Sequence, residues 1–446
     1  MVITTTGFTV LARHTALSSG LDDLRMAEYP GPLGIHDNAT VQQHIERTLI
    51  DRIVAGLTQS ADRNDAGAPA QGNPRDIVCT GTPDDINRFF VEKEWSDGLP
   101  LVPPTRERVE QFLRYTHRAP DETIAVLQSA NLRATPWNVA VNGVMAGCAP
   151  AHMPVLLAAA EALGDERCSL NNIGSSSGIF PFVLIGGPIA KQLNIESGAQ
   201  LVSRGANPVI GRAIGLMVKN IAGFRPGASY MGTFGYPLAF ALAEHDDNPW
   251  QPFHVGQGYD RDANTVTVGV TNNWGAASAP YDAPEKSGAQ TALEMLCKEI
   301  TGKTRLFNFP GRGPDAEAVM ITLVLSPPVA RSLADVGYSL QDVKRYVFEN
   351  TRMTLSDVEW VLRYTSIMGT TLQERVASGV YPPEFLGAPD DKVRVLSSPD
   401  ILHIMVCGDP YRNRLMVLEG GHTQPTTKEI QLPANWDDLL CDGEIR

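Results

Sequence analysis

The sequence lacks the short motifs that most often identify an enzyme class. It contains no phosphate-loop lysine motif, no H-E-x-x-H and no G-x-G-x-x-G. These absences exclude the standard forms of P-loop nucleotidases, zinc metalloproteases and dinucleotide-binding domains. Any catalytic site must therefore be sought in less familiar clusters of reactive residues.

Paired cysteines and long apolar runs are also missing. The six cysteines are widely spaced and form no C-x-x-C, so neither a disulfide framework nor a structural zinc site is expected. This pattern predicts a reducing, cytoplasmic compartment. Because no run of about 18 apolar residues occurs, we expect no transmembrane helix. The first residues also lack the basic and apolar regions of a secretory signal.

Positive charge is scarce relative to negative charge. The 446-residue chain has a formal net charge of −13, and 43% of its residues are hydrophobic. An acidic protein repels phosphate backbones and anionic lipids, so we expect neither nucleic acid nor a membrane as partner. The hydrophobic content is sufficient for a buried core. We therefore expect a globular protein that acts on a small molecule.

Apolar runs typical of strands alternate with segments of helical periodicity. This alternation predicts an α/β fold, with a layered mixed sheet or sheets flanked by helices and preceded by a small N-terminal unit. The length indicates two or three domains. The predicted units are a small N-terminal unit at 1–60, a linker at 61–81, a main α/β domain at 82–315 and a C-terminal α/β domain or subdomain at 316–446.

Turn residues, cap residues and apolar periodicity predict individual elements of the main domain. Thr82 ahead of Pro83 predicts a helix start. Residues 98–104 contain four prolines and glycines, so they predict an ordered loop after that helix. Alternating residues at 265–271 predict a strand, and 206–223 predict a long helix.

Cys148 is the first candidate for chemistry. It stands in Gly147-Cys148-Ala149-Pro150, between two helical segments. A thiol near the start of the second helix would be favoured as the reactive thiolate. The alternative is a small buried cysteine that packs against helices rich in alanine and glycine.

The segment 244–254 concentrates carboxylates and imidazoles. Glu244 and His254 are suited to general acid–base catalysis or to metal binding. For Asp246 and Asp247, a solvated turn is the plainer interpretation. His254 lies between two apolar residues, so a hydrogen-bonded core histidine is as consistent with the sequence as a catalytic one.

A loop of small polar residues precedes the apolar run at 179–188. Ser175, Ser176 and Ser177 lie in this loop and offer hydroxyls and backbone N–H groups to an anion. An ordinary surface loop fits equally well. Arg212, further along the chain, could bind a substrate carboxylate, although a salt bridge explains it as simply.

Several of these segments together resemble the UGSC family of (seleno)proteins, from about Asp85 to the C-terminus. The matching segments are Trp95-Ser96-Asp97-Gly98-Leu99-Pro100, Asn142-Gly143-Val144-Met145-Ala146-Gly147-Cys148, Gly187-Pro188-Ile189-Ala190, Ile210-Gly211-Arg212-Ala213 and Pro249-Trp250-Gln251-Pro252-Phe253-His254. Full-length relatives carry a U/C-G-S-C motif in a small N-terminal module. This chain has no such motif, so the resemblance does not imply its redox chemistry.

The resemblance emphasises certain positions. It implies that Asn142, Cys148, Glu244, Trp250 and His254 matter more than their acidic or cysteine neighbours. The family pattern has a serine at the position that Asn248 occupies here, so the chain departs from the family in this turn.

These observations lead to one main hypothesis. We expect an enzyme in which Cys148 attacks a small organic substrate, with lyase- or hydrolase-like chemistry at a C–S or acyl-like centre. His254 would act as base or acid, and Glu244 would orient it. No cofactor is expected. The residues expected to bind substrate are Trp95, Asp97, Asn142, Ser175, Ser176, Ser177, Arg212 and Trp250.

Two other functions remain open at this point. The chain could be a non-catalytic binding or scaffold subunit for a separate redox protein that carries the missing motif. It could also be a metal-dependent enzyme that uses His254, Glu244 and His245. Helices rich in glycine and alanine pack closely against a neighbour, so we also expect a homo-oligomer.

Overall fold

The computed structural model describes most of the chain. The described ranges are 1–21, 23–33, 36–58, 73, 75–174, 178–233, 239–274, 277–303, 320–364, 370–420 and 424–442. Ser175, Ser176 and Ser177, and most of the predicted linker at 61–81, lie outside these ranges.

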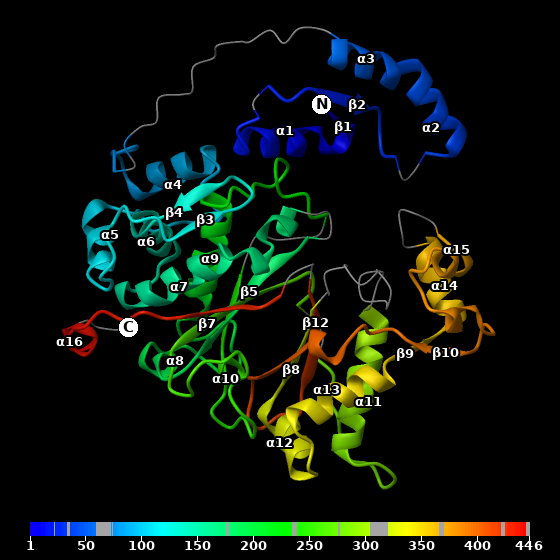
Figure 1. The fold of residues 1–446 in the computed structure, drawn as a ribbon. Coiled ribbons are helices and arrows are strands. Elements are labelled where there is room, and N and C mark those ends of the chain that lie inside the picture. The colour runs from blue at the N-terminus through cyan, green and yellow to red at the C-terminus, as the bar shows by residue number, and fades with distance from the viewer. Residues whose placement is uncertain are drawn as a thin grey trace.

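A four-stranded mixed sheet forms the centre of the main domain (Figure 1). Its strands are β5 (Phe180–Gly186), β6 (Phe240–Ala243), β7 (Thr265–Thr271) and β13 (Thr426–Glu429), in the order β13-β7-β5-β6. β5 runs parallel to β6 and antiparallel to β7. β5 and β7 are buried along their whole length, as continuous apolar strands covered on both faces must be. The α/β fold with mixed sheets and flanking helices is confirmed.

Long helices cover this sheet. The main ones are α6 (Pro136–Ala146), α7 (Met153–Leu163) and α9 (Asn207–Asn220). Thr135 caps α6 through a capping box, and Pro136 fills its first turn, where no N–H donor is needed. Gly211 lets α9 approach β6, because a Cβ at this position would lie 2.3 Å from the Ala239 carbonyl oxygen.

A second sheet has three strands, which are arranged like β6, β5 and β7 of the first sheet. It contains β8 (Ile321–Leu325), β11 (Leu402–Val406) and β12 (Leu415–Glu419), flanked by α11 (Gly288–Lys303), α12 (Pro327–Asp335) and α13 (Leu340–Asn350). The first strand, β8, is again central, parallel to β11 and antiparallel to β12. The two sheets therefore share one strand arrangement.

The carboxyl ends of the two parallel pairs meet. The His245 N–H donates to the Val406 carbonyl at 2.8 Å, and the Gly408 N–H donates to the Ser197 carbonyl at 2.7 Å. At the other end, the Thr271 hydroxyl donates to the Glu419 carbonyl at 2.9 Å. The loop that follows β6 is thus joined to the end of β11.

Long-range packing crosses the predicted boundary between 82–315 and 316–446. α11 belongs to the core of the second sheet although it precedes residue 316. β13 returns to the main sheet, where the Lys428 ammonium meets Asp165 at 2.8 Å. The C-terminal α16 (Trp436–Asp442) also returns, since the Tyr115 hydroxyl donates to the Leu439 carbonyl at 3.1 Å. Such pairings between distant segments leave no local signal.

The small N-terminal unit has its own two-stranded sheet. β1 (Val2–Thr5) and β2 (Met26–Tyr29) are parallel, and a helical stretch covers residues 38–58. The unit lies above the main domain in Figure 1. The Asn131 side chain joins the two by donating to the Ser18 carbonyl at 2.9 Å.

The remaining elements are short. They are α1 (Thr9–Ser18), α2 (Asn38–His44), α3 (Ile50–Thr58), α4 (Pro83–Glu92), α5 (Arg106–Leu113), α8 (Ile189–Gln192), α10 (Phe253–Gly256), α14 (Leu355–Tyr364), α15 (Leu372–Ala377), β3 (Ala125–Leu127), β4 (Leu132–Ala134), β9 (Arg352–Thr354) and β10 (Lys392–Arg394). Single turns are η1 (Thr6–Phe8), η2 (Ile45–Leu49), η3 (Pro150–His152), η4 (Glu166–Cys168), η5 (Leu170–Gly174), η6 (Pro383–Leu386) and η7 (Pro399–Ile401).

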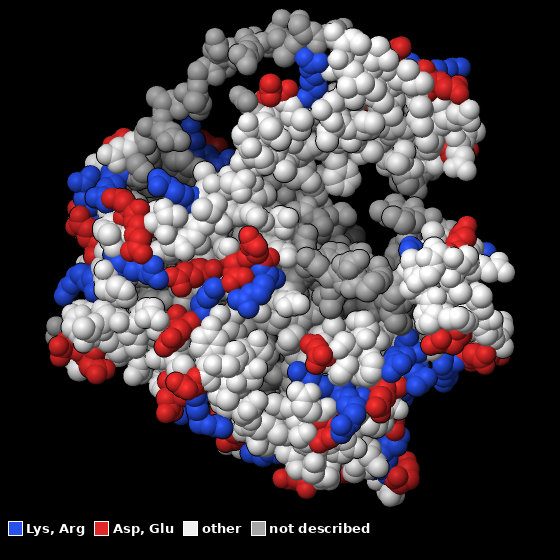
Figure 2. All heavy atoms as spheres, viewed as in Figure 1, with Lys and Arg blue, Asp and Glu red and all other residues white. Residues whose placement is uncertain are grey.

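The surface of the described residues gives no sign of a large charged or membrane-spanning feature. Acidic and basic side chains are interspersed on the face drawn in Figure 2. Among the described helices, none combines the length and the apolar character needed to cross a bilayer.

Candidate functional site

A cavity of about 350 Å³ opens where the parallel strands β5 and β6 end. We call it the Glu244 cavity. Its charged and polar lining comes from Lys191, Ser197, Glu244, His245, Asp246, Asn248, His254 and Arg261. The carboxyl ends of neighbouring parallel strands are the usual place for ligands in open α/β sheets, because the loops diverge there.

Two glycines after β5 shape the floor of this cavity. Gly187 has a φ of +91°, and a Cβ on it would lie 2.3 Å from the Ala263 carbonyl oxygen. A Cβ on Gly186 would lie 2.7 Å from Nδ1 of His254. Only glycine permits the 254–264 segment to lie so close to the strand end. The Gly-Gly-Pro turn therefore brings that segment into the site.

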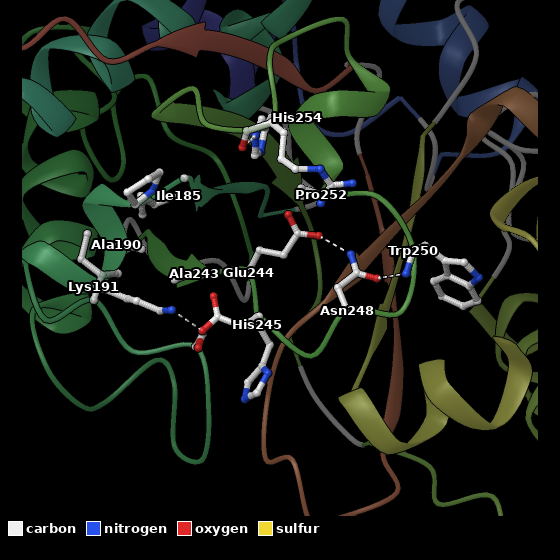
Figure 3. A pocket seen from close by; sticks show the side chains of 16 residues that line it. Ile185, Ala190, Lys191, Ala243, Glu244, His245, Asn248, Trp250, Pro252 and His254 are labelled. Atoms are coloured by element: carbon white, nitrogen blue, oxygen red, sulfur yellow. Dashed lines mark hydrogen bonds and ion pairs between the residues drawn. The ribbon is translucent and has the colours of Figure 1, made fainter. Parts of the chain in front are cut away.

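Glu244 follows β6 directly and points into the space between the sheets (Figure 3). Its Oε1 accepts a hydrogen bond from the Asn248 amide at 2.7 Å. The Phe253 N–H contacts Oε1 at 3.1 Å and Oε2 at 2.9 Å. Burial raises the pKa of Glu244 to about 7, although these hydrogen bonds favour the ionised form. A carboxyl group that titrates near neutral pH is suited to proton transfer.

His254 lines the same cavity as a positioning residue. Its Nε2 lies 3.1 Å from the Arg261 carbonyl oxygen, so Nε2 must carry the hydrogen. Its Nδ1 is buried, packs against Gly186 and has no partner among the described residues. No hydrogen bond joins His254 to Glu244 in this part of the chain. In the structure the His254 ring therefore holds the backbone at Arg261, whereas the sequence predicted it as a base.

Three side chains offer donors to an anion in the cavity. Lys191 reaches from α8 toward the loop after β6, where it meets Asp246 at 2.6 Å (Figure 3). The Nδ1 of His245 accepts from the Asp247 N–H at 3.1 Å, which leaves Nε2–H to face outward. The Arg261 guanidinium lines the cavity and has no acceptor among the described residues. The Asp246 carboxylate lines the cavity as well and pairs with Lys191, so Arg261 is the basic side chain of the lining without an ion pair among the described residues.

Cys148 does not join this site, which corrects the predicted nucleophile. The Cys148 thiol is buried, donates to the Val209 carbonyl at 3.2 Å and does not line the Glu244 cavity. Burial raises its pKa far above the ordinary range for a thiol. A helical stretch does follow Cys148, since η3 begins at Pro150 and leads into α7 at Met153, so burial is what disfavours the thiolate. The Cys148–His254–Glu244 constellation is therefore not assembled.

The Trp95–Pro100 loop is docked by one face of α9. The Arg212 guanidinium donates to both Asp97 oxygens at 2.8 and 2.9 Å. The Lys219 ammonium donates to the Ser96 carbonyl at 2.6 Å, and the Asn220 amide donates to the Trp95 carbonyl at 3.0 Å. Asp97 and Arg212 bind each other, so the pair anchors the loop to α9, and their role in substrate binding stays a prediction.

The other predicted binding residues lie in two places. Asn142 and Trp95 line an apolar cavity of about 650 Å³, where the Asn142 Oδ1 accepts from Asn220 at 2.9 Å. Trp250 lines the Glu244 cavity, and its indole N–H donates to the Tyr338 carbonyl at 2.9 Å. Ser175, Ser176 and Ser177 lie outside the described residues. Only Glu244, His254 and Trp250 are therefore brought together.

Lys191 and Arg261 were not predicted from the sequence. Lys191 follows the Gly-Gly-Pro turn by only three residues, so the rule that ligands bind at strand ends could have identified it. Arg261 has no local signal, since its place depends on the contact between Gly187 and Ala263.

The described residues contain no group of three or more histidine, cysteine, aspartate or glutamate side chains arranged to hold a metal ion. Glu244 accepts from backbone and amide donors, and His254 donates to a carbonyl.

Thiol labelling of the native protein is expected to separate the cysteines by exposure. Cys441 is exposed and Cys79 partly exposed, whereas Cys148 and the other three are buried. We expect an aromatic disulfide reagent to modify Cys441 and Cys79 first and Cys148 only on unfolding, because the buried thiol is neither accessible nor ionised. Mass spectrometry of timed samples would identify each site. Rapid labelling of native Cys148 would contradict this placement.

Comparison of the chain with models of protein families, with curated proteins and with solved structures gave no match.

Proposed function

We propose that this protein is an enzyme that moves a proton on a small organic anion, with Glu244 as the general base. One observation carries the proposal: a buried carboxyl group with a pKa of about 7 lies in a cavity that also contains Lys191 and Arg261. A base of this pKa is about half ionised at neutral pH and matches the proton affinity of weak carbon acids better than an ordinary glutamate does.

The charged residues of the cavity would have separate roles in binding the substrate and in taking its proton. Arg261 and Lys191 would bind the carboxylate of the substrate through charge-assisted hydrogen bonds. Oε2 of Glu244 would take the proton, because it has one donor whereas Oε1 has two. The C–H bond next to the carboxylate or a carbonyl breaks, and its electron pair moves onto the adjacent carbonyl oxygen. Return of the proton would give an isomerase, and loss of a leaving group a lyase.

His254 supports this arrangement without touching the reacting atoms. Its hydrogen bond to the Arg261 carbonyl sets the backbone from which the guanidinium extends. The reactive groups of the cavity are thus one base and two cations. The proposal keeps lyase chemistry as one outcome. Its central reactive residue is the base Glu244, whereas the sequence had predicted the nucleophile Cys148.

Hydrogen exchange into D₂O is the direct test. A panel of 2-hydroxy, 2-oxo and unsaturated carboxylic acids would be incubated with the protein and followed by proton NMR. We expect at least one of them to exchange a carbon-bound hydrogen or to eliminate. Glu244→Gln should lower that rate by roughly 10²- to 10⁴-fold, the usual contribution of a positioned general base.

Glu110→Gln is a matched control for this experiment. Glu110 is an exposed residue of α5, so its replacement changes the charge by the same amount far from the cavity. The control should exchange at the wild-type rate. If Glu244→Gln retained full activity on an acid that the wild type turns over, Glu244 would not be the base.

A further inference from the structure

A second cavity of about 390 Å³ lies on the other side of the 250–252 segment. We call it the Lys344 cavity. Trp250 and Pro252 line both cavities, so only this segment separates them. Its remaining polar and apolar walls come from Phe253, Ser339, Leu340, Lys344, His403 and Ile404. α10, α13 and β11 therefore contribute to one enclosed space.

Two basic side chains face each other in this cavity. Lys344 comes from α13 and His403 from β11, and neither has a hydrogen bond or ion pair with any other described residue. Burial lowers the pKa of Lys344. Burial, together with the charge of Lys344, lowers the pKa of His403 to about 4. A partly buried cation without a counter-ion is costly, so an anion in the cavity would stabilise it.

No carboxylate forms an ion pair with Lys344 or His403 among the described residues. The charge of Asp400 raises the pKa of both groups against the effect of burial. Its carboxylate is held by the Ser398 hydroxyl at 3.2 Å. Asp342 of the same helix is likewise occupied, because it accepts from the Ser339 hydroxyl and N–H in a capping box. Both nearby carboxylates are thus engaged in local hydrogen bonds.

The start of α13 adds further donors. This 11-residue helix begins at the cavity, where the N–H groups of Leu340 and Gln341 have no acceptor among the described residues. First-turn N–H groups and the helix dipole favour an anion. Lys344 lies one turn further along the same helix. Two backbone donors, an ammonium group and an imidazole therefore surround one volume.

From this arrangement we propose that the Lys344 cavity binds the anionic end of a small organic ligand. The ammonium of Lys344 and the first turn of α13 would hold a carboxylate or a phosphate group. Trp250 and Phe253 would contact its apolar part, since their rings form the opposite wall. The site is separate from the Glu244 cavity and does not depend on the function proposed there.

Titration calorimetry with two aromatic anions is the test. Phenyl phosphate and benzoate share an apolar ring and differ in the anionic group, so their relative affinity assigns the ligand class. We expect the wild-type chain to bind at least one of them. Lys344→Gln should weaken that binding roughly ten- to hundredfold, the share of a charge-assisted hydrogen bond. Lys344→Arg should retain much of it.

Two further variants serve as controls for this binding experiment. Lys298→Gln removes an exposed lysine of α11 and should bind as the wild type does. Arg261→Gln tests whether the probe sits in the Glu244 cavity instead. The proposal is overturned if neither anion binds, if Lys344→Gln binds as tightly as the wild type, or if only Arg261→Gln loses binding.

Discussion

Replacing Glu244 with glutamine is expected to stabilise the protein at pH 8 by up to about 3 kcal/mol and to leave it almost unchanged at pH 4.5. Burial raises the pKa of Glu244 from its usual 4.5 to about 7 in the folded state. Each unit of pKa difference between folded and unfolded states corresponds to about 1.4 kcal/mol. The glutamine removes a carboxylate that the folded protein ionises only at a cost.

The sign of this effect follows from proton binding. Between pH 4.5 and 7 the folded chain holds the Glu244 proton more tightly than the unfolded chain does. The stability contributed by the protonated group is complete below pH 4.5 and is lost as the pH rises through 7. The difference between the variant and the wild type should therefore grow across this window and level off above it.

The comparison between variants matters because other groups titrate in the same range. Burial lowers the pKa of His152 and of His403 to about 4, which makes the folded state more stable as the pH rises toward 6.5. This pH dependence of the stability opposes the one that Glu244 causes. It cancels only when the stabilities of the variant and the wild type are subtracted from each other. Urea denaturation of the wild type, Glu244→Gln and the control Glu110→Gln at half-unit pH steps would measure it. A flat difference curve would mean that the carboxyl group has an ordinary pKa.

Elements with strong local signals were predictable from the sequence. The Thr82-Pro83 start is observed as a capping box on α4, and the alternation at 265–271 is β7 to the residue. The helix predicted at 206–223 is α9, shortened to Asn207–Asn220. In these segments cap chemistry and periodicity point the same way as the packing does, so local reasoning suffices.

The site was less predictable because it depends on contacts between distant segments. β6 is four residues long, and its role is set by pairing with β5 rather than by its own pattern. Glu244 and His254 were identified because they lie in one short segment. Cys148 was misplaced, since the sequence does not reveal that its thiol turns toward the Val209 carbonyl on α9. The sequence indicates which residues are reactive, and packing decides which of them meet.

The second large effect is expected at the ion pair between Asp97 and Arg212. Their side chains are only 5% and 18% exposed, and the guanidinium binds both carboxylate oxygens. Removing one partner of such a pair leaves the other charge unpaired, which costs roughly 3–5 kcal/mol in comparable cases. Arg212 keeps its hydrogen bonds to the carbonyls of Leu99 and Pro100. We therefore expect Asp97→Ala to lower the free energy of unfolding by about 3 kcal/mol.

An exposed ion pair provides the matched control. Arg331 and Asp247 lie 3.2 Å apart with side chains 45% and 48% exposed, so Asp247→Ala should cost less than about 1 kcal/mol. Arg212→Lys should be destabilising as well, because an ammonium group cannot bind two oxygens in the same plane. Urea denaturation of these variants and of the double variant Asp97→Ala/Arg212→Ala would give the coupling energy. Fully additive losses would contradict a direct role for the pair.

This pair also bears on how the sequence resemblance should be understood. The W-S-D-G-L-P segment is one of the segments that carry the resemblance, and Asp97 is the acidic residue within it. In the structure this carboxylate accepts hydrogen bonds from a side chain of α9. The carbonyls of Ser96 and Trp95 also accept from side chains of this helix. If Asp97→Ala lowers stability without affecting hydrogen exchange on a substrate beyond the loss of folded protein, the segment is a docking loop. Its distinctive sequence would then reflect the demands of α9 and not those of catalysis.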